Sequence, residues 1–175
     1  MEEIFDIYTR DGKHLWTAPK SVCHSEDPGF YHKPVWIWII DKYKNKILVQ
    51  KRAAVKKSHP NKWDIPCAGH VLAGENIIDW VIREVSEELG IQTKESDYKF
   101  ICEYIVDETR EIAQIYLLKL DLDIDKFKLK KNEVAEVKWL NYGEFKKLFD
   151  SDDFDEHSDE YREFTLNILK ENFTK

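Results

Sequence analysis

The sequence predicts a single α/β domain, and three features of the chain support that class. Apolar residues recur at helical spacing from Ile78 to Leu89, as in an amphipathic helix. Several short runs rich in β-branched and aromatic residues have the length of strands. The 175 residues, 42% hydrophobic and 13% aromatic, suffice for one domain with a proper core and argue against disorder.

The predicted elements follow one another without a long linker or an internal repeat. Residues 1–30 are expected to form an N-terminal hairpin or extension, in which the Asp11-Gly12 turn joins strands at 4–9 and 14–16. Further strands are expected at 35–40, 46–51, 98–106, 112–120 and 137–140, with short extended pieces within 64–72. Asn141 is a helix N-cap residue for a helix over 142–149, and residues 156–172 have the pattern of an amphipathic C-terminal helix.

The helix before Gly90 carries three glutamates on a face of its own. Glu84, Glu87 and Glu88 centre roughly 130° away from the apolar stripe. Crowded carboxylates repel one another unless a cation lies between them, and hard oxygen ligands suit Mg²⁺ or Mn²⁺ better than zinc. The segment indicates a divalent-metal enzyme that acts on phosphates. The alternative is an ordinary solvated helix face, in which Arg83 and Glu87 form a surface ion pair.

The loop and helix between Gly69 and Ile91 resemble the Nudix box of the Nudix hydrolases. Its defining positions are filled by Gly69, Glu75, Arg83, Glu84, Val85, Glu87, Glu88, Gly90 and Ile91. The resemblance implies a Nudix-type α/β/α sandwich with a mixed sheet, one Nudix hydrolase domain over residues 1–175, and hydrolysis of a diphosphate linked to another group. It also implies three roles within the box. The three helix glutamates bind metal, the Gly69 carbonyl assists them, and Arg83 pairs with Glu75.

The segment that precedes the box is similar to isopentenyl-diphosphate isomerases and to isomerase-like Nudix hydrolases. The similarity covers residues 52–63 and the run Cys67-Ala-Gly-His70. It implies that Arg52 and Lys56 bind the substrate diphosphate and that Lys20 is a further phosphate-binding residue. Cations on a loop beside a carboxylate-bound metal can clamp a diphosphate from its other side. The alternative is that Lys56 and its neighbour Lys57 are ordinary loop lysines.

The same similarity implies a second metal site. His24, His32 and His70 lie at places that match the metal-binding histidines of the isomerases, although the interval from His24 to His32 is one residue longer. Glu111 matches one of their glutamates, whereas Thr109 stands where another is expected. Imidazoles with a carboxylate can bind Mn²⁺ or Zn²⁺. The alternative is a set of hydrogen-bonded structural histidines.

Two departures from the isomerases favour hydrolysis. The isomerase cysteine falls at Ala68, so the Cys67 thiol is offset by one residue and points to the other side of an extended chain. Isomerases also lack acidic residues at the positions of Glu84 and Glu87. Metal-assisted attack of water on a diphosphate is therefore the favoured chemistry, ahead of isomerisation and of a non-catalytic diphosphate-binding module. The proton acceptor is one of the box glutamates, Glu87 and Glu88 foremost, or Glu133 or Glu136.

Composition and charge limit the kinds of partner that the chain is expected to bind. The net charge of −7 and the lack of a basic run argue against nonspecific nucleic-acid binding. The longest apolar run, 35–40, is too short to span a membrane. Three cysteines without metal-site spacing suggest reduced thiols and a cytoplasmic location. The expected partners are a small-molecule diphosphate, Mg²⁺ or Mn²⁺ and, given the aromatic content, a second copy in a homodimer.

Overall fold

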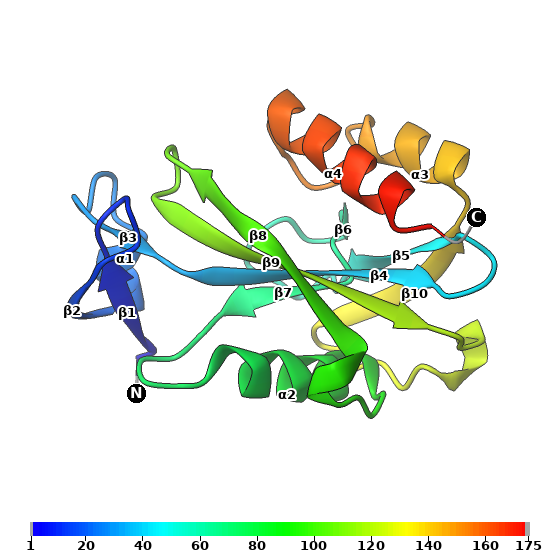
Figure 1. Ribbon diagram of the computed structural model, residues 1–175, viewed down its shortest axis with the longest axis horizontal. Coiled ribbons are helices and arrows are strands. Elements are labelled where there is room, and N and C mark those ends of the chain that lie inside the picture. The colour runs from blue at the N-terminus through cyan, green and yellow to red at the C-terminus, as the bar shows by residue number, and fades with distance from the viewer. Residues whose placement is uncertain (1, 174–175) are drawn as a thin grey trace.

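A computed structural model of the chain describes residues 2–173. A mixed β-sheet lies between helix α2 (Ile77–Leu89) on one face and helices α3 (Tyr142–Phe149) and α4 (Asp159–Glu171) on the other (Figure 1). The predicted α/β sandwich with a mixed sheet is confirmed. No helix in this part of the chain is both long and apolar enough to cross a bilayer.

The sheet is mixed because β9 runs parallel to two of its neighbours. It pairs in parallel with β4 and β3, whereas the other strand pairs are antiparallel. The main path runs through β10 (Val134–Leu140), β5 (Ile47–Arg52), β4 (Pro34–Asp41), β9 (Glu111–Leu120), β3 (Tyr31–His32), β1 (Ile4–Tyr8) and β2 (His14–Pro19). Three strands join from the side: β6 (Trp63–Asp64) on β5, β7 (Cys67–His70) on β4, and β8 (Tyr98–Val106) on β9.

The short elements differ most from the sequence-based expectation. Helix α1 (Lys20–Cys23), strand β3 and the 3₁₀ turns η1 (Glu95–Asp97) and η2 (Ile124–Lys126) were not predicted. Strand β10 starts three residues earlier than expected, because pairing with β5 extends it back to Val134. Helix α4 starts at Asp159, where the Ser158 hydroxyl accepts a hydrogen bond from the Tyr161 backbone N–H. Tertiary pairing thus sets the start of β10, and the Ser158 cap sets the start of α4.

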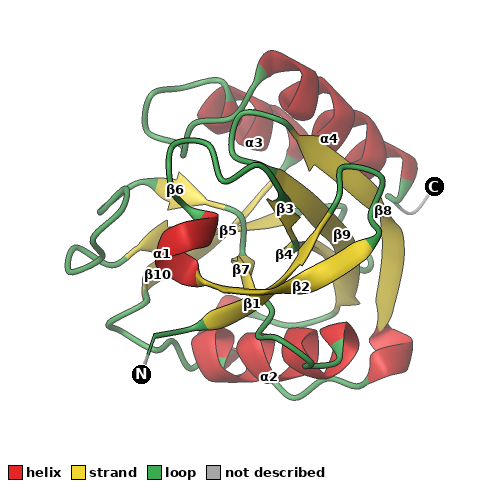
Figure 2. Ribbon diagram, turned by 90° about the vertical axis from the view of Figure 1, so that its left-hand side faces the viewer, coloured by secondary structure: helices red, strands yellow, loops and turns green. Residues whose placement is uncertain are grey.

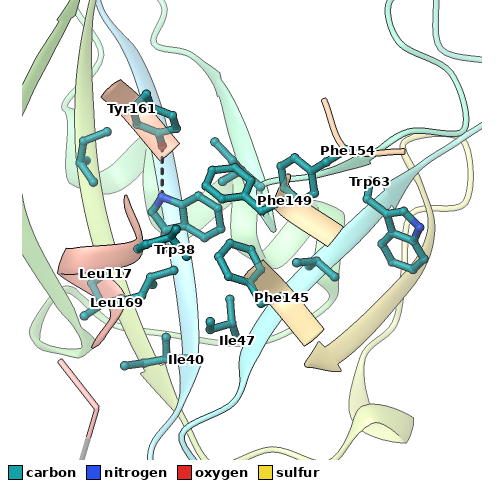
Figure 3. Packing of buried hydrophobic residues seen from close by; sticks show 14 of the residues in the cluster. Trp38, Ile40, Ile47, Trp63, Leu117, Phe145, Phe149, Phe154, Tyr161 and Leu169 are labelled. Carbon is teal, nitrogen blue, oxygen red and sulfur yellow. Dashed lines mark hydrogen bonds between the residues drawn. The ribbon is translucent and has the colours of Figure 1, made fainter. Parts of the chain in front are cut away.

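Alternation along β4 divides the interior into two cores. Trp38 and Ile40 face α3 and α4, and Ile37 and Ile39 face α2. In the core under α3 and α4, aromatic rings surround Trp38, whose indole N–H donates a 3.2 Å hydrogen bond to the Tyr161 hydroxyl (Figure 3). Side chains that alternate along β4 and its neighbours therefore belong to different faces of the sheet.

The N-terminal hairpin closes one end of the sheet. Strands β1 and β2 and helix α1 lie together at that end, away from the C-terminal helices (Figures 1 and 2). Their small core consists of Phe5, Ile7, Ala18 and Cys23. This end adjoins β7 and the start of β9, from which His70 and Glu111 project.

Candidate functional site

Strand β7 and helix α2 are pressed closely together at the start of the box. A Cβ atom added to Gly69 would lie 2.9 Å from the Trp80 ring of α2, closer than packed carbon atoms come. Glycine at this position therefore permits the close approach of strand and helix. Asn76 caps the N-terminus of α2, where its side chain accepts hydrogen bonds from two backbone N–H groups, and Gly90, with a φ of 68°, caps the C-terminus.

Arg83 connects the box loop to the acidic face of α2. Its guanidinium donates a 3.0 Å hydrogen bond to the Glu75 carboxylate. The same guanidinium donates to Glu84 at 2.6 Å and reaches Glu87 at 3.4 Å. The Arg83–Glu75 pairing expected from the sequence is therefore present, and it extends to two of the predicted metal ligands. Arg83 sets the loop and the glutamates relative to each other.

Glu88 is the buried member of the acidic face. Within residues 2–173, its Oε2 atom is buried and has no hydrogen-bond partner. Burial raises the pKa of Glu88 to about 7; the Cys67 thiol opposes this rise, and the carboxylates of Glu84 and Glu133 add to it. A buried acceptor without a donor is costly. A cation bound here would satisfy that oxygen and relieve the repulsion, so the residues fit the Mg²⁺ or Mn²⁺ expected from the sequence.

Two loops bring a lysine and a further carboxylate to Glu88. The backbone N–H of Lys130 donates to the Glu88 carbonyl at 3.0 Å, which places the segment before β10 at the end of α2. The Glu133 carbonyl accepts a 2.9 Å hydrogen bond from the Ala53 N–H. Lys56 forms an ion pair with the Glu133 side chain. Of the predicted residues, Lys56, Glu133 and Glu88 thus come together, with Glu84 beside them.

Three other predicted residues have different surroundings. Glu136 pairs with Lys138 on β10 at 3.1 Å. The Arg52 guanidinium donates to the buried Asp64 carboxylate at 2.8 Å and to the Ser58 carbonyl at 3.1 and 3.2 Å, so it fastens the 53–62 loop. Lys20 contacts Glu3 at 2.5 Å and stands 5.9 Å from the Phe5 ring, on the side of the histidines.

The three predicted histidines form a cluster, although they come from three separate segments. One ring nitrogen from each of His24, His32 and His70 lies within 4.8 Å of the others. Glu111 is 3.5 Å from His32 Nε2 and 3.4 Å from His70 Nε2. Burial opposes ionisation of Glu111, but the contacts with His32 and His70 prevail and lower its pKa to about 2. The sequence-predicted second set is therefore brought together in full.

The histidine cluster offers ligand atoms of the kinds that bind metal ions, and several of them lack a hydrogen-bond partner. In the described part of the chain, both ring nitrogens of His32 and Nε2 of His70 are buried without a hydrogen-bond partner. Burial and the neighbouring His70 and His32 lower the pKa of His24 to about 4, which favours the neutral imidazole that binds metals. Imidazole nitrogens with a carboxylate suit Mn²⁺ or Zn²⁺.

Packing and one hydroxyl orient this cluster. The Phe5 ring is stacked on His70, with centroids 4.9 Å apart and an interplanar angle of 13°. Thr109, which stands where the isomerases have a glutamate, donates a 3.0 Å hydrogen bond to Glu111 Oε2. Thr109 therefore orients the one carboxylate that remains.

The Cys67 thiol and Glu111 face opposite sides of the sheet. Cys67 is buried in the core on the α2 side. Ala68 lies opposite Trp36 in the β4–β7 pair, and Trp36 packs against the core under α3 and α4. Glu111 is two residues before Ala113 on β9, which belongs to that same core. The sheet thus separates the two groups that an isomerase would need to oppose across its substrate.

Several neighbours of the site were not predicted. Lys130 Nζ lies 3.8 Å from Glu87 Oε2, the Cys67 thiol lies against Glu88, and Phe5 covers the histidines. Lys130 is one of several lysines in a charged stretch, and Phe5 is an ordinary apolar strand residue. No local pattern in the sequence distinguishes them, because their contacts are made across long separations in the chain.

Comparison with known proteins identifies a family and several similar proteins. A family model described as NUDIX domain matches residues 30–162. The chain is 30% identical over 163 residues to Nudix hydrolase 3 of Arabidopsis thaliana, with 87% of this chain covered, and it spans 21% of the plant protein. It is 32% identical over 127 residues to an uncharacterized Nudix hydrolase of Listeria monocytogenes, with 73% of each chain covered. An isopentenyl-diphosphate delta-isomerase of Gibberella zeae is 26% identical over 175 residues, covering 86% of this chain and 68% of the isomerase.

Solved structures show a similar fold. A Deinococcus radiodurans protein superposes with a TM-score of 0.72 at 14% identity, covering 98% of this chain and 100% of that one. The MutT protein of Methanosarcina mazei superposes with a TM-score of 0.59 at 24% identity, covering 83% and 96%. At these identities the likeness concerns the fold alone.

Proposed function

This chain belongs to the NUDIX domain family, and from that membership we propose that it is a divalent-metal-dependent pyrophosphohydrolase with the acidic face of α2 as its catalytic centre. Its substrate class is a small molecule in which a diphosphate is linked to another group, such as a nucleoside. The proposal assigns Mg²⁺ or Mn²⁺ to the carboxylates of Glu84, Glu87 and Glu88, with the Gly69 carbonyl as a further ligand.

One observation carries this proposal. Glu88 holds a buried carboxylate oxygen that has no hydrogen-bond partner in residues 2–173, and burial, with a further contribution from the carboxylates of Glu84 and Glu133, raises the pKa of the same group. An unpaired buried charge destabilises the fold. Such an arrangement is retained where a cation compensates for it, which is the requirement of a metal-dependent phosphate enzyme.

Residues around the acidic face have separate proposed roles in hydrolysis. When bound, the cation neutralises the diphosphate and lowers the pKa of a water nucleophile. Lys56 lies beside Glu88 and Glu133 and supplies positive charge for a phosphate oxygen. Glu133, partly exposed and adjacent to Glu88, is the proposed proton acceptor, with Glu87 and Glu88 as the alternatives inside the box. Arg52 holds the loop that carries Lys56.

The histidine cluster is proposed as a second cation site, held by His24, His32, His70 and Glu111. The orphaned nitrogens of His32 and His70 support this assignment. Lys20, at the same end of the molecule and paired with Glu3, is proposed to bind a phosphate on that side. A cation in this cluster would lie across β7 from the acidic face of α2, because a side chain at Gly69 would face Trp80 of α2 and that of the next residue, His70, lies on the opposite side of the strand.

An isomerase is the second candidate, supported by the similarity to the Gibberella zeae enzyme. The placement of Cys67 and Glu111 on opposite faces of the sheet argues against it. A binding module without turnover is the third candidate, and the complete set of box carboxylates argues against that.

A panel assay separates the three candidates. The protein is incubated with Mg²⁺ and a series of nucleoside and isoprenoid diphosphates, and the products are identified by mass spectrometry. Hydrolysis gives a monophosphate and inorganic phosphate. Isomerisation gives a product of unchanged mass, which chromatography ahead of the mass spectrometer resolves from the substrate, and a binding module gives neither product.

Substitutions test the catalytic centre within the same assay. Glu87→Gln or Glu88→Gln should lower Mg²⁺-dependent turnover on the order of a hundredfold, because a charged metal ligand is lost. Glu136→Gln serves as the matched control, since that carboxylate pairs with Lys138 instead, and it should stay within about twofold of the unmodified protein. Undiminished turnover in Glu88→Gln would exclude the acidic face as the centre.

A further inference from the structure

The N-terminal hairpin holds the turn of the box loop from outside the box. The Leu72 carbonyl accepts a 3.0 Å hydrogen bond from the Glu75 N–H, and Gly74 between them has a φ of 75°. This is the arrangement of a type II turn, which favours glycine at its third position. The turn itself leaves the N–H groups of Ala73 and Gly74 unused.

Both of these N–H groups are taken up by strand β1. The Ala73 N–H donates to the Ile4 carbonyl at 2.8 Å, and the Gly74 N–H donates to Asp6 Oδ2 at 2.8 Å. Strand β1 pairs with β3 only through Ile7 and Tyr8. The box loop therefore occupies the edge of β1 that β3 leaves free.

Asp6 is placed to make this contact by the hairpin. It lies on β1 opposite Thr17 of β2, and its other carboxylate oxygen, Oδ1, contacts His14 Nε2 at 2.9 Å. Phe5 and Ile7 on either side are buried, whereas the Asp6 side chain is 25% exposed. Alternation along the strand thus directs its carboxylate outward to Gly74 while Phe5 covers the histidines.

The held turn leads directly into the acidic face of α2. Glu75 follows Gly74 and accepts from Arg83, and Arg83 in turn donates to Glu84 and reaches Glu87. A continuous series of contacts therefore runs from Asp6 to the proposed metal ligands. A displacement of the turn would be passed to those carboxylates through Glu75 and Arg83.

We propose that Asp6 is a positioning residue for hydrolysis: its carboxylate fixes the Gly74 turn and, through Glu75 and Arg83, the metal-binding glutamates. The N-terminal hairpin, which precedes the matched residues 30–162, is then a working part of the catalytic centre. This inference rests on the proposed function. Gly74 is exposed to solvent, so loss of Asp6 leaves its N–H to water and loosens the turn locally, without unfolding the domain.

Three kinds of substitution test this role. Asp6→Ala and Asp6→Thr both remove the carboxylate, and threonine also keeps strand preference. Asp6→Asn keeps an oxygen that can accept from the Gly74 N–H. His14→Ala removes the other partner of Asp6 and leaves the contact with Gly74 in place. For each variant, kcat, KM, the half-saturating Mg²⁺ concentration, the thermal midpoint and the hydrogen-exchange rate of the Gly74 amide are measured.

The proposal predicts a specific pattern. Asp6→Ala and Asp6→Thr should lower kcat and raise the half-saturating Mg²⁺ concentration, each by about tenfold, because a charge-assisted hydrogen bond of the loop is lost. The Gly74 amide should exchange faster in both. Asp6→Asn should recover most of the activity, and His14→Ala should stay within about twofold of the unmodified protein.

Two results would contradict the proposed role of Asp6. Unchanged kcat and Mg²⁺ dependence in Asp6→Ala or Asp6→Thr would overturn the proposal, as would a loss in Asp6→Asn equal to that in Asp6→Ala. If the unmodified protein hydrolyses no diphosphate, the proposed function fails by itself. The exchange rate of the Gly74 amide then still decides whether Asp6 holds the turn.

Discussion

At the scale of single residues, the adjacent lysines Lys56 and Lys57 lie in different surroundings. Lys56 is partly buried, pairs with Glu133 and affects the pKa of Glu88, whereas Lys57 is exposed. Lys56→Ala should raise KM for a diphosphate substrate about tenfold, since one charged contact to phosphate is lost. Lys57→Ala is the matched control and should leave KM unchanged. Steady-state kinetics at saturating Mg²⁺ give KM for both variants. Equal KM values would mean that Lys56 is an ordinary loop lysine.

His157 gives a residue-scale prediction about pH. Its ring lies among Trp36, Phe149, Phe154 and Tyr161. Burial lowers its pKa from 6.5 to about 4; Asp155 and Glu111 oppose this shift, and Arg162 and His59 add to it. Between these two values the unfolded chain binds a proton that the folded protein does not. Stability from neutral His157 is therefore present above pH 6.5 and lost as the pH falls through 4.

Substitution isolates that contribution. His157→Phe keeps an aromatic ring in the cluster and removes the titrating group, so the decline in unfolding free energy between pH 6.5 and 4 should become shallower. Urea unfolding at a series of pH values measures it, with His14→Ala as a control for an exposed histidine. Parallel pH profiles for His157→Phe and the unmodified protein would contradict the assignment.

At the scale of elements, the packing of α2 on β7 depends on one missing side chain. A Cβ atom on Gly69 would meet the Trp80 ring at 2.9 Å. Gly69→Ala should destabilise the protein by about 1–3 kcal/mol, because strand and helix must move apart. Replacing Trp80 by leucine as well should recover part of that loss, since the clashing ring is gone. Denaturant titration of the two single variants and the double variant gives the coupling, and strict additivity would contradict the contact.

Some elements could be predicted from the sequence alone and others could not. The stripe from Ile78 to Leu89 predicts α2 because its signal is local and repeats over three turns. Strand β3 has two residues and forms through pairing with β1 and β9. Because these partners lie elsewhere in the chain, the local sequence does not predict it. The same contrast holds in the site. The box glutamates form a local pattern, whereas the Asp6–Gly74 contact joins residues 68 positions apart.

The family resemblance supplied what local pattern could not. His24, His32, His70 and Glu111 come from four segments, and no spacing rule would group them. Their assembly in the structure is a tertiary result, because the segments that carry them meet at one end of the sheet. For Arg52 the resemblance predicts contact with the substrate diphosphate, and this stays a prediction. The structure adds contacts that the sequence did not predict, because its guanidinium donates to Asp64 and Ser58.

At the scale of the whole molecule, β7 separates two candidate cation sites of different chemistry. On the α2 side the donors are carboxylate oxygens, which suit Mg²⁺ and Mn²⁺. On the other side they are imidazole nitrogens with Glu111, which suit Mn²⁺ and Zn²⁺. The two sites should therefore differ in metal preference and be separable by substitution.

Metal titration of the whole chain tests this arrangement. The metal-stripped protein should take up Mn²⁺ at two sites and Mg²⁺ at the acidic site alone. His32→Ala should remove one Mn²⁺ and leave Mg²⁺ binding intact, because His32 is buried among the histidines and belongs to the cluster across β7 from the acidic face of α2. Glu88→Gln should abolish Mg²⁺ binding and remove one Mn²⁺, and the Mn²⁺ of the histidine cluster should stay bound. Calorimetry with elemental analysis gives both stoichiometries, and a circular dichroism spectrum of each variant excludes unfolding as the cause. Loss of both sites in one variant would mean that the two clusters hold their cations jointly, and a single Mn²⁺ in the unmodified protein would reduce the histidines to a structural role.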